Sequence, residues 1–123
     1  MNRWTQDKLA RIAATDDLHI SPLRDDNVTY GTPTWIWSVV VRDQLFVRAY
    51  NGQASRWYKA AMRQKNGRIT AAGMTRDVVF QCADIELQDA IDAAYRAKYR
   101  SSPYLKPMIG AQSQSATVEI SPR

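Results

Sequence analysis

The side chains best suited to chemistry lie in residues 48–63, where basic and aromatic residues alternate. Arg48 and Tyr50 have the two-residue spacing that places side chains on one face of a strand. A turn at Asn51 follows, and Ser55 is placed to begin a helix. Because the first N–H groups of a helix carry partial positive charge, they can bind an anion such as phosphate. The pattern therefore predicts an anion site where strand, turn and helix meet.

The predicted helix carries a basic stripe along one face. Arg56, Lys59 and Arg63 recur at helical spacing, so their side chains share that face. A stripe of this kind can surround a bound phosphate. The alternative interpretation is that it is a solvated face and that Ser55 is only the helix cap.

Aromatic side chains crowd around the same corner of the chain. Trp35 and Trp57 can stack on a planar ring such as an isoalloxazine or a base, or they can belong to the core. Combined with the anion-binding groups they define a candidate binding site. Its predicted members are Arg48, Tyr50, Ser55, Arg56, Trp57 and Lys59.

Several other kinds of site are excluded by the residue types present. His19 is the only histidine and Cys82 the only cysteine, so a metal site would need carboxylates at no recognisable spacing. The chain has no glycine-rich phosphate loop and no nucleophile elbow. We therefore predict no metal ion and assign no catalytic residue.

The site must be positioned by strands and short helices. Residues 34–42 alternate with a period of two and reverse at residues 42–44 into a second strand over residues 45–50, which predicts a hairpin. Both faces of this hairpin are largely apolar. Such a pattern is typical of a barrel strand or of a strand that a helix covers.

The rest of the chain alternates between the same two kinds of element. Helices are predicted over residues 5–14, 55–65 and 86–99, the second ending at a left-handed Asn66-Gly67. Further strands are predicted over residues 68–72, 75–82 and 116–120, with a short edge strand within residues 18–23. The residues expected to be buried are Trp35, Trp37, Val39, Val41, Leu45, Val47, Ile69, Val78, Phe80, Leu87, Ile91 and Tyr95.

This order predicts an α+β fold: a small antiparallel split β-barrel of about six strands with two or three flanking helices. The 123 residues suffice for one domain over residues 1–123 and leave no room for two good cores. With one cysteine and no apolar leader or membrane-length segment, we expect a cytoplasmic protein. The net charge of +5 favours anionic partners.

Five segments in a specific order resemble an uncharacterised bacterial family of unknown function: residues 31–37, 45–52, 56–61, 67–69 and 94–99. That family is in turn similar to the flavin-binding split β-barrels, which include pyridoxamine-phosphate oxidases and deazaflavin-dependent reductases. In those proteins a Ser-Arg-Lys sequence opens the helix after the phosphate-binding strand. Here Ser55-Arg56 match it, while Trp57 replaces the lysine. The Trp57-Tyr58 pair resembles that of the deazaflavin reductases.

The resemblance implies a ligand and an assembly. The ligand would be flavin mononucleotide (FMN) or a deazaflavin, bound through its phosphate, with a redox reaction carried by the flavin ring. The assembly would be a homodimer. The alternative is a non-enzymatic module that binds nucleic acid or another anionic partner, which requires a steep dependence on salt. We rank nucleic acid second because twelve acidic residues interleave the basic ones.

Overall fold

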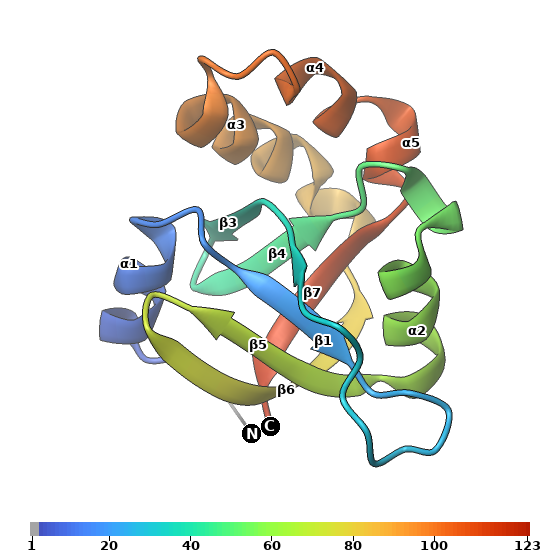
Figure 1. Ribbon diagram of the computed structural model, residues 1–123. Helices are drawn as coiled ribbons and strands as arrows, with labels where there is room; N and C mark the ends of the chain where they lie inside the picture. Colours follow the sequence, from blue (N-terminus) through green and yellow to red (C-terminus); the bar gives the residue numbers. More distant parts are fainter. Residues whose placement is uncertain (1–2) are drawn as a thin grey trace.

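The computed structural model describes residues 3–123 and contains one antiparallel sheet of seven strands (Figure 1). The strand order across the sheet is β2-β1-β5-β6-β7-β4-β3, and every pair of neighbours is antiparallel. The strands are β1 (His19–Pro22), β2 (Thr34–Trp35), β3 (Ser38–Val41), β4 (Gln44–Arg48), β5 (Asn66–Ala71), β6 (Met74–Cys82) and β7 (Thr117–Pro122).

The sheet curls until its two edges nearly meet. The edge strands β2 and β3 lie at opposite ends of the strand order, yet only Ile36 and Trp37 separate them in the chain. Since two residues span only about 7 Å, the sheet must bend round on itself. This arrangement confirms the predicted α+β class and the curled, split-barrel form of the sheet, with seven strands in place of about six.

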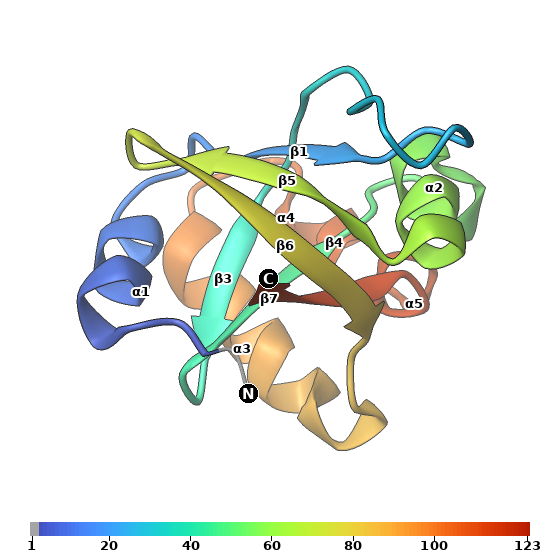
Figure 2. The same ribbon diagram turned by 90° about the horizontal axis from the view of Figure 1, so that it is seen from below.

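Five α-helices surround this sheet within residues 3–123, more than the two or three predicted. They are α1 (Gln6–Ala13), α2 (Arg56–Gln64), α3 (Gln88–Tyr99), α4 (Leu105–Met108) and α5 (Ala111–Gln114). Helices α3, α4 and α5 gather over one end of the sheet, while α1 and α2 lie on opposite sides (Figures 1 and 2). None of the described helices combines the length and apolar character that crossing a bilayer requires.

Strand β4 separates two hydrophobic clusters, as its two apolar faces predicted. Leu45 and Val47 face the interior of the curled sheet with residues of α1, β1, β5 and β7. Phe46 faces the opposite way and packs with Ile91 and Tyr95 of α3. Because side chains alternate along β4, one face of the strand packs into the barrel interior and the other packs against the helices.

The predicted hairpin is confirmed at its turn. Arg42 and Asp43 connect β3 to β4 with φ of 51° and 65°. Two consecutive left-handed residues are the geometry of a two-residue type I′ turn, whose twist matches that of the flanking strands. The left-handed residue that ends α2, in contrast, is Lys65 with φ of 66°, and Asn66 and Gly67 already belong to β5.

The expected continuous strand over residues 34–42 is wrong. The chain leaves β2 at Trp35 and crosses to the other edge of the sheet before β3 begins at Ser38. The crossing turns Trp35 outward, leaving 53% of it exposed, and leaves Trp37 and Val41 half-buried. The other residues expected to be buried are buried.

Strand β1 is also not the edge strand that Pro22 suggested. It pairs with β5 on one side and with β2 on the other. Proline is tolerated because β2 pairs only with His19 and Ile20, so no partner strand there needs a proline N–H. Gly67 lies opposite Pro22, where an added Cβ would come within 2.6 Å of the Ser21 carbonyl oxygen.

Candidate functional site

A cavity of about 640 Å³ opens where β2, the end of β4, the start of α2 and the α4 segment meet. Its volume lies within the range of about 300–1,000 Å³ that small-molecule sites occupy. Its lining residues are Thr34, Trp35, Ile36, Trp37, Arg48, Tyr50, Asn51, Ser55, Arg56, Trp57, Tyr104 and Met108.

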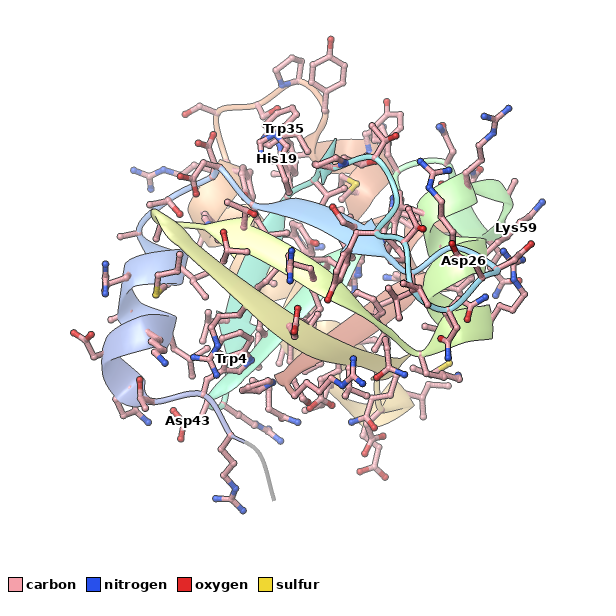
Figure 3. The ribbon with its side chains drawn as sticks, turned by 60° about the horizontal axis from the view of Figure 1, so that its bottom comes forward. Trp4, His19, Asp26, Trp35, Asp43 and Lys59 are labelled. Carbon is pink, nitrogen blue, oxygen red and sulfur yellow. The ribbon has the colours of Figure 1, made fainter. Side chains whose placement is uncertain are left out.

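The cavity brings together five of the six residues predicted for the site. Arg48, Tyr50, Ser55, Arg56 and Trp57 all line it, as does Trp35. Lys59 is exposed and does not belong to the lining. Figure 3 shows it on the side of α2 that faces away from Trp35, one turn beyond the cavity.

Arg48 lines the floor of the cavity but has its hydrogen bonds elsewhere. It is 1% exposed, and each of its five N–H groups has a partner inside the protein. Nε donates to the Thr117 hydroxyl at 3.0 Å, and the two terminal nitrogens donate to Asp92, to the Met108 carbonyl and to Gln88. The buried Asp92 carboxylate offsets the charge of Arg48, and Arg48 has no N–H left for a ligand.

Asp92 completes this buried network. One carboxylate oxygen accepts from Arg48, and the other accepts from Gln114 Nε2 at 2.8 Å. The network therefore ties β4 and α3 to the α4–α5 segment, which supplies Tyr104 and Met108 to the cavity wall. It positions the wall of the site.

The start of α2 offers free donors at the cavity. Ser55 has the extended backbone of a helix cap, but its side chain makes no capping hydrogen bond, and the first turn of α2 has no acidic residue. Arg56 is exposed and lines the cavity. The uncapped first turn and the Arg56 guanidinium thus present donors and positive charge to the same space.

The basic stripe predicted on α2 does not act as one unit. Arg63 pairs with Asp25 at 2.8 Å, and both side chains are largely exposed. Arg56 remains the residue of the stripe that lines the cavity. Among residues 3–123, the lining contains two arginines and no aspartate, glutamate, histidine or lysine. Asp92 pairs with Arg48 from behind the lining, so Arg56 is the charge that favours an anionic ligand.

Aromatic rings form much of the remaining wall. Trp37 stacks on Tyr99 with centroids 4.0 Å apart and planes 2° apart. Burial raises the pKa of the Tyr99 hydroxyl to about 12, so the ring that stacks on Trp37 stays neutral. Tyr50 meets Tyr104 edge to face at 6.2 Å at the mouth, where both are substantially exposed.

Tyr104 and Met108 are site residues that the sequence did not reveal. They lie in the connection after α3, which carries no motif and is brought to the cavity by the Arg48 network. Within the described part of the chain, no group of three or more His, Cys, Asp or Glu side chains is arranged to hold a metal ion.

No curated protein matches the sequence. The structure is similar to the crystal structure of the conserved hypothetical protein Rv2991 from Mycobacterium tuberculosis, with a TM-score of 0.61 and 12% sequence identity. That similarity covers 98% of this chain and 80% of the other, and at this identity it shows a shared fold alone. Residues 8–120 match the family described as an uncharacterized protein conserved in bacteria, DUF2255. The chain therefore belongs to this uncharacterised bacterial family.

Proposed function

We propose that the cavity binds FMN or a deazaflavin and that the protein supports a redox reaction of the bound ring. The observation that carries the proposal is the composition of this one cavity. An uncapped helix start, an exposed arginine and several aromatic rings share about 640 Å³ with no carboxylate in the lining. This donor set fits a ligand with a phosphate at one end and a planar ring at the other.

The phosphate end would be held at the start of α2. The Arg56 guanidinium can donate two parallel hydrogen bonds to phosphate oxygens, and the first-turn N–H groups of α2 point toward the same end. Arg48 keeps its internal partners and does not contact the phosphate. Ser55 keeps a hydroxyl free for the ligand, since it caps nothing.

The ring would lie among the aromatic side chains. Trp35 and Trp57 line the cavity, and Trp35 is 53% exposed, so a planar ligand can cover it without displacing core residues. A bound flavin itself supplies the hydride or electron chemistry. The chain's own residues bind the phosphate, orient the ring and cover one of its faces.

The test is a fluorescence titration of the purified protein with FMN and with the deazaflavin. We expect binding of one of them at tens of micromolar or below. Because charged hydrogen bonds contribute about 1.5–3 kcal/mol each, Arg56→Ala should weaken binding about tenfold or more. Arg63→Ala is the matched control, since Arg63 lies on the same helix but pairs with Asp25 outside the cavity.

Failure of both flavins to bind at tens of micromolar, or equal affinities of the two variants, would contradict the proposal. Binding of single-stranded oligonucleotide that weakens steeply with salt would favour the nucleic-acid alternative. That alternative needs a continuous basic surface, whereas Arg63 is paired and Lys59 lies outside the cavity.

The resemblance to split barrels also leads us to propose a homodimer. The support in this chain is the exposed aromatic rim of the cavity, where Trp35, Tyr50 and Tyr104 are 53%, 46% and 60% exposed. A second copy packed on this rim would cover those rings and deepen the cavity. Sedimentation velocity at micromolar concentration should give a dimer, and a monomer would contradict this proposal.

A further inference from the structure

A groove, separate from the cavity described above, lies between the α1–β1 connection and the end of α3. Its volume is about 510 Å³, and its lining residues are Ala13, Ala14, Thr15, Asp16, Asp17, Lys98 and Tyr99. Tyr99 lines this groove and stacks on Trp37, which lines the cavity, so the pair separates the two spaces. Within residues 3–123, Lys98 is the one lysine that lines either space.

Lys98 is held in an unusual setting for a lysine. It is half-buried on α3, and its Nζ donates to the Ser38 carbonyl oxygen at 2.8 Å. The same nitrogen lies 5.4 Å from the centroid of the Tyr99 ring. No carboxylate in residues 3–123 comes within ion-pairing distance of it.

The charged groups that face Lys98 do not offset its burial. Burial lowers the pKa of its ammonium group, and the carboxylates of Asp16 and Asp17 raise it by less. Tyr99, the neighbouring titratable group on α3, stays neutral because burial raises its own pKa to about 12. The strand that packs against Lys98 presents only the neutral Ser38 carbonyl. A larger share of Lys98 is therefore the free amine at neutral pH than for a solvated lysine.

We propose that Lys98 is a nucleophilic amine that forms an imine with small uncharged aldehydes entering this groove. The neutral amine can keep one N–H on the Ser38 carbonyl and direct its lone pair into the groove. Attack forms the C–N bond and a carbinolamine, and loss of water then gives the imine. Nitrogen loses two protons, which leave in that water, so atoms and charge balance.

The walls of the groove fit this ligand class and assist the proton transfer. The carboxylate of Asp16 makes no hydrogen bond within the described structure, whereas Asp17 Oδ1 accepts from the Ala72 N–H at 3.0 Å. Asp16 is therefore the group available to relay a proton from nitrogen to the departing hydroxyl. The two acids repel anionic aldehydes, which selects uncharged ones.

The experiment uses the full chain and glycolaldehyde as the probe, with cyanoborohydride to reduce the imine to a stable secondary amine. At limiting reagent and neutral pH, peptide mass mapping should find Lys98 modified several-fold more than the exposed Lys65 and Lys106. The pH of half-maximal labelling should be lower at Lys98 than at those two controls. Lys98→Arg keeps the positive charge and a donor for Ser38, so its other lysines should label as in the parent.

Equal labelling of the three lysines would overturn the proposal, as would protection of Lys98. Protection would mean that Lys98 serves only to hold β3 against α3 through the Ser38 carbonyl. Glycolate, the carboxylate counterpart of the probe, should not slow labelling of Lys98 when added in excess. Competition by glycolate would contradict the assigned selection for uncharged ligands.

Discussion

Arg48→Met is expected to lower the free energy of unfolding by about 3–5 kcal/mol, because it leaves the Asp92 carboxylate buried without its cation. The Arg48 side chain is fully buried and that of Asp92 is 10% exposed, so water cannot take over the lost contacts. The substitution also removes the donors to Thr117, Gln88 and the Met108 carbonyl. Urea unfolding followed by circular dichroism measures the change.

A matched control is Arg63→Met, which removes an exposed partner of Asp25 and should cost no more than about 1 kcal/mol. The double variant Arg48→Met with Asp92→Leu should be more stable than Arg48→Met alone, since no charge is left buried. If Arg48→Met costs no more than the control, the buried network does not hold the helical layer on the sheet.

Trp4→Ala is expected to lower the free energy of unfolding by about 3–5 kcal/mol, because it leaves a large cavity in the interior of the curled sheet. Trp4 is 7% exposed and belongs to the same hydrophobic cluster as Leu9 and Ile12 of α1. Its Nε1 donates to the Ile120 carbonyl oxygen of β7 at 2.8 Å. It lies at the end of the sheet opposite Trp35 (Figure 3). Thermal and urea unfolding both report the loss.

Two further variants separate the causes of that loss. Trp4→Phe keeps most of the buried ring and loses the hydrogen bond to Ile120, so it should cost only about 1 kcal/mol beyond its smaller volume. Trp35→Ala removes an indole that is 53% exposed and one exposed hydrogen bond to the Asp16 carbonyl, so it should cost only about 1 kcal/mol of stability while weakening the proposed flavin binding. Equal losses for Trp4→Ala and Trp35→Ala would mean that Trp4 does not close the barrel interior.

Arg48 shows how the stability network and the candidate site depend on each other. Its bond to the Met108 carbonyl, at 3.1 Å, holds the α4 segment that carries Tyr104 and Met108 into the cavity wall. A loss of ligand affinity in an Arg48 variant would therefore reflect a displaced wall, whereas the same loss in an Arg56 variant would reflect a lost contact. The two residues are best compared in one titration series.

Local patterns along the chain determined most of the elements. The alternation in residues 45–50 predicted a strand with two apolar faces, and both faces of the observed β4 are packed. Thr5 caps α1 through a hydrogen bond from the Lys8 N–H, and α2 follows Ser55. These features depend on the periods of two and 3.6 and on short-range hydrogen bonds, which the sequence specifies directly. The corner proposed to bind an anion was predicted for the same reason: strand, turn and helix are consecutive.

Only the tertiary structure determined which residues from other parts of the chain line the cavity at that corner. The alternation of residues 34–42 gave no sign of the break at Ile36 and Trp37, because closing the sheet, rather than local preference, makes the chain change edges there. That crossing exposes Trp35 to the cavity. The hydrogen-bond partners of Arg48 lie 40 to 69 residues away from it in the sequence. Arg48 was predicted to bind phosphate, but these distant partners make it a buried structural residue. Contacts between residues so far apart in the sequence form only when the sheet closes, so no local sequence pattern predicts them.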